Sequence, residues 1–159
     1  MTDGPHHRLI DIQLDEKTLV RRRPEVEHER AIAIYDLLEE NFFHPIGSES
    51  GPYALTIGIA ENRLLFDIVG ASGIPIPDVV LSLAPFRTIV KDYFLICESY
   101  YAAIKQSTPT QIEAIDMSRR GLHNEGAEIL HERLAGKVDI DLETARRLFT
   151  LICVLHIRG

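Results

Sequence analysis

The sequence predicts an α+β fold: a single two-layer domain with about four mostly antiparallel strands and about four helices packed on one face. Apolar residues alternate with polar ones in several segments of the first half, which is typical of strands. Elsewhere they recur at spacings of three and four, which is typical of amphipathic helices. The 159 residues have the length of one domain. We therefore expect one domain over residues 1–159, with residues 1–7 flexible.

The N-terminal third predicts a strand, a helix and a loop. Apolar and polar residues alternate well enough over residues 8–14 to predict a strand. Pro24 suits the first position of a helix, where its missing N–H costs nothing, and the acidic residues that follow suit the positive end of the helix dipole. Apolar spacing then predicts a helix over residues 25–41. Residues 44–52 hold two Pro, two Gly and two Ser, and are predicted to form a loop.

The middle of the chain predicts the rest of the sheet. Residues 53–60 and 64–68 alternate on either side of Glu61–Asn62, which indicates an antiparallel hairpin, although the turn lacks the favoured Asn-Gly pair. A Gly- and Pro-containing loop over residues 70–77 follows. The short apolar run in residues 78–83 predicts the last strand.

The second half predicts helices. Pro85 begins one whose apolar stripe is so wide that we expect it to be central in the fold. Thr108 to Gln111 fits a capping box, so the next helix begins there. We expect that helix to break at Gly121, to restart at residue 124 or 125 and to end at Gly136. Residues 137–140 are too short to assign, and Asp141 suits the N-cap of a last helix.

Charge and composition exclude several classes of protein. The net charge of −7 argues against a protein that binds nucleic acids or anionic membranes through a broad basic face. Hydrophobic residues make up 45% of the chain, enough for a core. No apolar run approaches the about 18 residues that span a bilayer, and residues 1–7 do not resemble a signal peptide. Cys97 and Cys153 lie in helical patterns, so we expect buried, reduced thiols in a cytoplasmic protein.

The segment Arg119–Gly126 is the strongest candidate site. A helix that restarts after Gly121 would direct free backbone N–H groups at a pocket, and helix N-termini attract anions. Arginine guanidinium groups bind carboxylate or phosphate, and a histidine adds an acid or a base. The predicted ligand is a small anion, and the predicted ligand-binding residues are Arg119, Arg120, His123, Asn124 and Glu125. The alternative is that Gly121 and Asn124 only cap two helices while both arginines pair with surface carboxylates.

No metal or cofactor is predicted. Glu25 and His28, and likewise Glu128 and His131, have the spacing found in di-iron bundles, but such bundles need four long helices and two further inward Glu residues. Solvated helix faces explain both pairs. No His or Cys cluster has zinc-ligand spacing.

Aromatic and basic clusters bear on partners. Tyr93, Tyr100 and Tyr101 occupy two adjoining faces of one helix, and an exposed aromatic strip would suit a homo-oligomer or another protein partner. The clusters Arg21–Arg23 and Arg146–Arg147 are expected to pair with nearby carboxylates. The alternative is that an acidic partner or a nucleic acid uses them, and the net charge of −7 argues against it.

Several long strings resemble a bacterial, alphaproteobacterial uncharacterised family, number 0262 in its series. They are residues 24–30, 85–87, 89–94, 97–101, 112–117, 119–121, 123–126, 144–151 and 158–159. The resemblance covers roughly residues 23–159 and is weakest in residues 1–20 and 70–77. It implies a bacterial cytosolic protein and brings no assigned activity, cofactor or catalytic residue.

Two functions follow as hypotheses. The first is a non-catalytic binding or protein-interaction module, because the sequence contains no recognisable catalytic motif. The second is a small-molecule anion-binding protein or enzyme with its site at the predicted Arg119–Gly126 helix break.

Overall fold

The computed structural model describes residues 6–15 and 24–156 and confirms the α+β class. The short 3₁₀ turn is labelled η1. The elements in chain order are β1 (Leu9–Leu14), α1 (Pro24–Glu39), β2 (Phe43–Pro45), β3 (Tyr53–Ala60), β4 (Arg63–Val69), η1 (Ala71–Gly73), β5 (Val79–Ser82), α2 (Ala84–Gln106), α3 (Pro109–Leu134), β6 (Val138–Ile140) and α4 (Leu142–His156). The predicted cluster Arg21–Arg23 lies outside the described residues.

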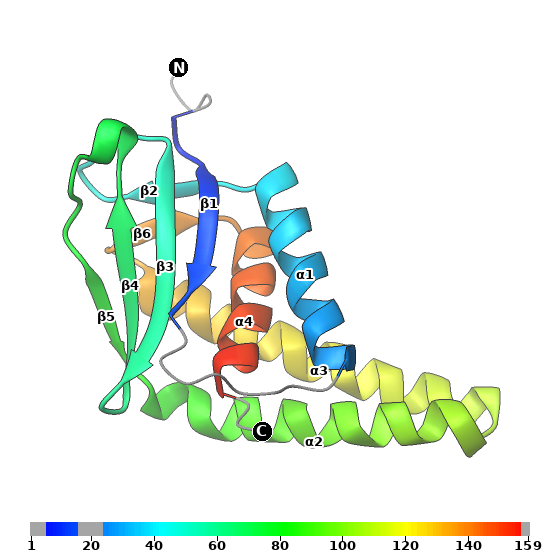
Figure 1. Cartoon of the computed structure of the whole chain (residues 1–159). Coiled ribbons are helices and arrows are strands. Elements are labelled where there is room, and N and C mark those ends of the chain that lie inside the picture. Colours follow the sequence, from blue (N-terminus) through cyan, green and yellow to red (C-terminus); the bar gives the residue numbers. More distant parts are fainter. Residues whose placement is uncertain (1–5, 16–23, 157–159) are drawn as a thin grey trace.

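The main sheet has the strand order β1-β3-β4-β5. Strand β1 runs parallel to β3, and the other two neighbouring pairs are antiparallel, so the sheet is mixed. Figure 1 shows this sheet on one side of the molecule and the four α-helices on the other. Burial alternates along β4 and along β3 from Tyr53 to Ile57, where inward positions are buried and outward positions are partly or fully exposed; beyond them Gly58 is also buried and Ile59 is half-buried. The predicted arrangement of one sheet with helices on one face is therefore confirmed.

The β3–β4 hairpin forms where the alternation predicts it. Ala60 pairs with Arg63, so Glu61 and Asn62 make a two-residue turn. Both residues have positive φ, 52° and 63°, which is the geometry of a type I′ turn. Asn tolerates this backbone better than Glu does, and neither has the freedom of Gly.

A second, two-stranded sheet was not predicted. Strand β2 pairs antiparallel with β6, so that Phe43 lies opposite Ile140. The prediction that residues 44–52 form only a loop is thus wrong for His44 and Pro45. Each strand has three residues, which is too short for an alternating pattern to be recognised.

Helix α4, rather than α2, is the central helix. It buries eight of its 15 residues and contacts β3 and the three other α-helices. Helix α2 buries six of 23 residues and leaves Leu95 and Ile104 more than half exposed. The wide apolar stripe of α2 is therefore only partly covered, because α2 pairs along its length with α3 and touches α4 over a short stretch (Figure 1).

The predicted helix ends are confirmed at three positions. Thr108 and Gln111 form the reciprocal capping box at the start of α3. Gly136 has a φ of 82° just after that helix. The backbone N–H of Thr144 donates to the Asp141 carboxylate at 2.8 Å, which is the expected N-cap of α4.

Helix α3 is continuous through Gly121, so the predicted break there is wrong. A Cβ at Gly121 would meet no atom within 4 Å, so this exposed position places no steric demand on the backbone. A glycine inside a helix costs only about 1 kcal/mol relative to alanine. Packing of α3 against α2 and α4 outweighs that cost, and no second helix begins at residue 124 or 125.

Candidate functional site

Arg119 and Arg120 both face Asp116, one helical turn earlier on α3. Nε and Nη2 of Arg119 donate to one Asp116 oxygen at 3.1 and 2.6 Å, and Nε of Arg120 lies 3.1 Å from the other oxygen. The hydrogen bond from Arg119 holds the pKa of the Asp116 carboxyl below its usual value. Arg119 also stacks over the ring of Tyr100, 4.8 Å from its centre. These two arginines are therefore engaged within their own helix and its neighbour α2.

His123 points from α3 toward α4. Its Nε2 lies 2.7 Å from the hydroxyl of Thr150, and its ring packs 5.3 Å from the rings of both Tyr93 and Phe149. Burial, together with the nearby guanidinium groups of Arg146 and Arg119, lowers the pKa of His123 to about 4. The imidazole is consequently neutral at pH 7 and acts there as a hydrogen-bonding group without charge.

Asn124 and Glu125 are exposed on α3. The Asn124 side-chain oxygen accepts a hydrogen bond from Nη1 of Arg146 on α4. Four of the five predicted residues thus separate into two groups. His123 and Asn124 contact α4, whereas Arg119 and Arg120 turn to Asp116.

A cleft of about 250 Å³ lies beside His123. Its lining comes from three helices: Glu29, Ile32, Ala33 and Asp36 of α1, His123 of α3, and Glu143, Arg146, Arg147 and Thr150 of α4. Neither Arg119 nor Arg120 is among these residues. The ligand-binding role of the five predicted residues remains a prediction, and of the five only His123 lines this cleft.

The cations of the cleft share one acidic partner. Arg146 Nε and Arg147 Nη2 each lie 3.9 Å from a different oxygen of Glu143. The expected pairing of these arginines with a helix carboxylate is confirmed. Both separations are longer than a hydrogen bond, and Glu143 is 65% exposed, so water competes for these contacts.

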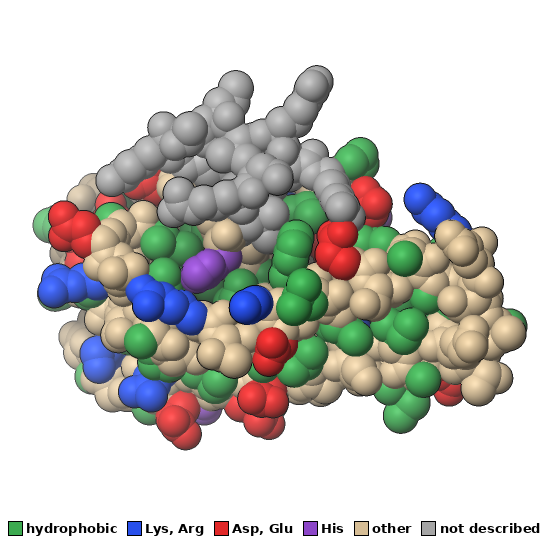
Figure 2. Space-filling model, turned by 90° about the horizontal axis from the view of Figure 1, so that it is seen from below, with side chains coloured by type: hydrophobic (Ala, Val, Ile, Leu, Met, Phe, Trp, Pro, Cys, Tyr) green, Lys and Arg blue, Asp and Glu red, His purple; other side chains and the backbone are tan. Residues whose placement is uncertain are grey.

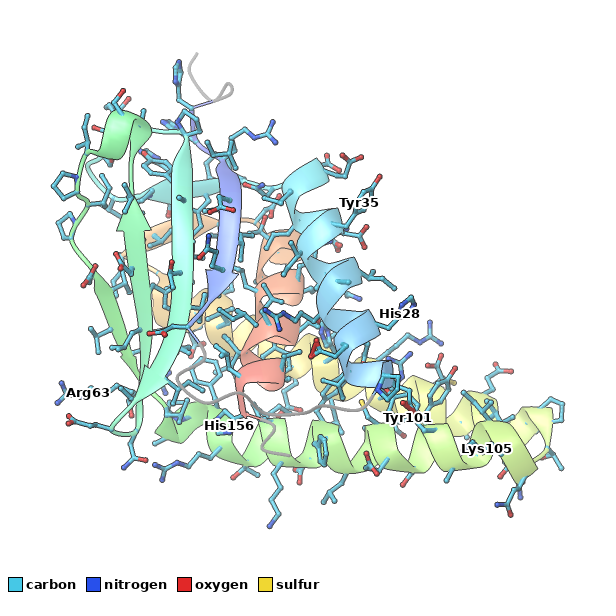
Figure 3. The ribbon with its side chains drawn as sticks, viewed as in Figure 1. His28, Tyr35, Arg63, Tyr101, Lys105 and His156 are labelled. Carbon is cyan, nitrogen blue, oxygen red and sulfur yellow. The ribbon has the colours of Figure 1, made fainter. Side chains whose placement is uncertain are left out.

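The α1 side of the cleft carries the opposite charge. Glu29 accepts a hydrogen bond of 2.8 Å from the hydroxyl of Tyr101, which Figure 3 shows beside the N-terminal end of α1. Asp36 lies two turns further along the same helix. Ile32 and Ala33 supply apolar surface between these two acids. The cleft therefore combines two guanidinium groups on α4 with carboxylates on α1.

The profile of the uncharacterised protein family UPF0262 matches residues 6–158. The chain belongs to the UPF0262 family. The match includes β1, which precedes residues 23–159, the part of the chain whose sequence resembles this family.

Relatives of high identity are known in alphaproteobacteria. A UPF0262 protein of Rhodospirillum rubrum is 69% identical over 151 residues, which cover 95% of this chain and 93% of the relative. One from Paramagnetospirillum magneticum is 65% identical over 156 residues, covering 98% and 99%. One from Brucella canis is 57% identical over 158 residues, covering 99% and 98%. No solved structure is significantly similar to this UPF0262 chain.

The thiols of this UPF0262 protein belong to the core, as predicted. Cys97 and Cys153 are both buried. Burial raises the pKa of the Cys97 thiol to about 11 and that of Cys153 well above its ordinary value. Both side chains are therefore protonated at neutral pH and pack as small apolar groups.

The expected aromatic strip on α2 is not a free surface. Tyr93 is buried, Tyr100 stacks with Arg119, and Tyr101 is hydrogen-bonded to Glu29.

The two Glu-x-x-His pairs predicted on solvated faces are exposed at His28 and His131, and Figure 3 shows His28 pointing outward from α1.

Surface charge and helix length relate to whether the protein binds nucleic acids or crosses a membrane. On the face shown in Figure 2, the Lys and Arg side chains of the described residues are interspersed with Asp and Glu, so these residues form no broad basic patch there. None of the described helices is long and apolar enough to cross a membrane.

Proposed function

We propose that this protein is a non-catalytic binding module that takes a small anionic ligand in the cleft between α1 and α4. The observation that carries the proposal is the pair Arg146 and Arg147 at the cleft, whose shared acidic partner is the exposed carboxylate of Glu143 at 3.9 Å; Arg146 also donates to the Asn124 side chain. In the described part of the chain, the Arg147 guanidinium makes no other polar contact. An incoming carboxylate or phosphate would replace a weak ion pair by bidentate hydrogen bonds.

The other walls of the cleft limit what fits. Glu29 and Asp36 repel a ligand with several negative charges, and Ile32 and Ala33 favour a short apolar portion. The volume of about 250 Å³ suits a small molecule rather than a chain segment. A monoanion, or a compound that carries an amine as well as a carboxylate, complements this distribution of charge.

The chemistry of His123 supports binding over catalysis. A general acid or base works best with a pKa near the working pH. The pKa of His123 is about 4, chiefly because the ring is buried, and its Nε2 is engaged by Thr150. Within this proposal His123 is an uncharged part of the cleft wall, held in place by Thr150.

Thermal denaturation of the purified protein against a panel of small carboxylates, phosphates and amino acids tests the proposal. A ligand at about 100 times its Kd adds roughly 2.7 kcal/mol, which raises the Tm of a chain of this size by about 2–4 °C or more. Arg147→Gln should abolish the shift, and Arg147→Lys should reduce it because lysine lacks the bidentate fork.

Arg120→Gln is the matched control. Arg120 is an exposed arginine on α3 that lies outside the cleft, so its loss should leave the shift unchanged. A shift that Arg120→Gln removes and Arg147→Gln retains would overturn the assignment to this cleft. A panel without any shift would overturn the binding function for the compounds tested.

A second candidate, a protein-interaction module, is favoured by apolar side chains on α1. Ile32 and Tyr35 are 46% and 66% exposed, one helical turn apart, and Figure 3 shows Tyr35 pointing away from the fold. Sedimentation velocity over a range of concentrations tests self-association through this face. Dimer formation should be weakened by Tyr35→Ser and unaffected by Met117→Ser, an equally exposed position on α3. A wild-type protein that stays monomeric at all concentrations would exclude a homo-oligomer.

A further inference from the structure

Three side chains from separate parts of the sequence meet beside the small sheet. His7 precedes β1, His44 is the middle residue of β2, and Glu49 lies in the loop between β2 and β3. The backbone brings them together, because the N–H of Phe43 donates to the carbonyl of His7 at 3.0 Å. None of the three lines the α1–α4 cleft.

The three side chains have the separations of a metal-ligand set. One nitrogen from each histidine and one carboxylate oxygen of Glu49 all lie within 4.8 Å of one another. Nε2 of His7 is 4.0 Å from Oε1 of Glu49, and Nε2 of His44 is 3.5 Å from Oε2. Ligand atoms around a tetrahedral Zn²⁺ with bonds of 2.0–2.1 Å stand about 3.3 Å apart. The Glu49 side chain is 80% exposed on its loop, so it has room to close this difference.

The burial of His7 is the independent observation that points to a ligand. Its side chain is only 9% exposed, and its Nδ1 has no hydrogen-bond partner. The ring lies stacked on that of His44, with centres 3.7 Å apart and planes within 5°, and packs edge-on against Phe42. A buried polar nitrogen without a partner is destabilising and calls for an explanation such as a bound ion.

We propose that His7, His44 and Glu49 bind a divalent transition-metal cation of the zinc type. Two imidazoles and a carboxylate are ligands that Zn²⁺ and its neighbours in the first row accept. Coordination through Nδ1 would give the unpartnered nitrogen of His7 a partner, and binding would link the N-terminal segment to β2 and its loop. Nε2 of His44 donates to the carbonyl of Ser48 at 2.8 Å, so a metal bound at this nitrogen would take the place of that hydrogen bond.

The proposed site supplies three protein ligands and leaves the fourth position to water. Structural zinc sites usually have four protein ligands, whereas three ligands and a water leave the metal open to a further molecule. Ser48, in the loop between β2 and β3, and Tyr53, the first residue of β3, have hydroxyl groups that lie 3.0 Å apart. The metal is therefore expected to exchange with solvent and to be removed by chelators.

Metal titration of the full, untagged chain after treatment with a chelator tests this site. We expect one Zn²⁺ per chain by calorimetry, and Co²⁺ in its place should give the visible absorption of a low-coordinate site. Glu49→Gln and His44→Asn should each weaken Zn²⁺ binding by about tenfold or more. Glu49→Gln changes an exposed side chain, so it is expected to fold even where a change at the buried His7 prevents folding.

Two matched variants control for adventitious binding by surface side chains. Glu113→Gln and His131→Asn remove the same groups from exposed positions on α3, and both should bind Zn²⁺ as the wild type does. Circular dichroism in the presence of chelator checks that each variant is folded. Folded Glu49→Gln and His44→Asn proteins that bind Zn²⁺ with wild-type affinity would overturn the proposal. So would a wild-type chain that binds no Zn²⁺.

Discussion

Gly126 of α3 lies directly against the ring of Phe149 of α4. A Cβ built on Gly126 would stand 2.1 Å from Cζ of Phe149, which is far inside van der Waals contact. This glycine lets α3 and α4 approach closely. The ring it accommodates also contacts His123, so the packing at Gly126 positions one wall of the cleft.

The two glycines of α3 should respond to alanine in opposite directions. Gly126→Ala forces Phe149 or the helix to move and should lower the free energy of unfolding by about 1–3 kcal/mol or more. Gly121→Ala meets open space and should raise it by up to about 1 kcal/mol, because alanine favours the helix. Urea denaturation of both variants measures the difference. A destabilised Gly121→Ala protein would show that α3 needs flexibility there.

Asn41 acts as a hydrogen-bonding partner for the edge strand β1. Its side-chain oxygen accepts from the N–H of Leu9 at 2.7 Å, and its Nδ2 donates to the carbonyls of Leu9 and Leu37 at 3.0 and 2.7 Å. Asn41→Ala leaves these groups without their partner and should cost about 2–4 kcal/mol in chemical denaturation. Asn41→Asp keeps the acceptor but places a carboxylate oxygen against both carbonyls, so a loss at least as large as that of Asn41→Ala is expected. A loss below about 1 kcal/mol in Asn41→Ala would mean that water replaces the amide.

Stability should depend on pH through His123. Burial lowers the pKa of this imidazole to about 4 in the folded protein, whereas the unfolded chain has the ordinary value of 6.5. The unfolded state therefore takes up a proton first, and stability falls as the pH drops from about 6.5 to about 4. The shift corresponds to at most about 3 kcal/mol. Denaturation at pH 7.0, 5.5 and 4.5 should show a shallower fall in His123→Gln, and equal slopes would contradict this role.

The β3–β4 turn should accept a residue better suited to its backbone. Glu61 has a φ of 52°, a conformation that costs most side chains about 1 kcal/mol and that Asn adopts more readily. Glu61→Asn should therefore raise the Tm, with a gain of a few tenths to about 1 kcal/mol. Asn62→Ala, at a φ of 63°, should lower the Tm and serves as the opposite control. A Tm unchanged in both variants would show that the turn contributes little to stability.

Local patterns in the sequence were sufficient wherever neighbouring residues decide the structure. The capping box at Thr108, the N-cap at Asp141 and the left-handed Gly136 each depend on residues within one helical turn. The β3–β4 hairpin is likewise determined by alternation on both sides of a short turn.

The structural features that local patterns did not predict depend on partners that are distant in the chain. Gly121 would favour a break in an isolated helix, but α3 is covered by α2 and α4. The cleft combines α1, α3 and α4, and nothing in the local sequence relates Arg147 to His123. His7 and His44 are 37 positions apart and have no recognisable ligand spacing. Only the pairing of the backbone around Phe43 brings them together.

The pairing of β2 with β6 has a consequence for how the chain emerges from the ribosome. Phe43 is synthesised 97 residues before its partner Ile140, which at about 5–20 residues per second is a delay of roughly 5–20 s. During that interval the nascent chain can close the β3–β4 hairpin, whose strands are separated by two residues, but not the small sheet. Strand β2 and the face of α1 that α4 covers therefore stay without their partners until translation is nearly complete.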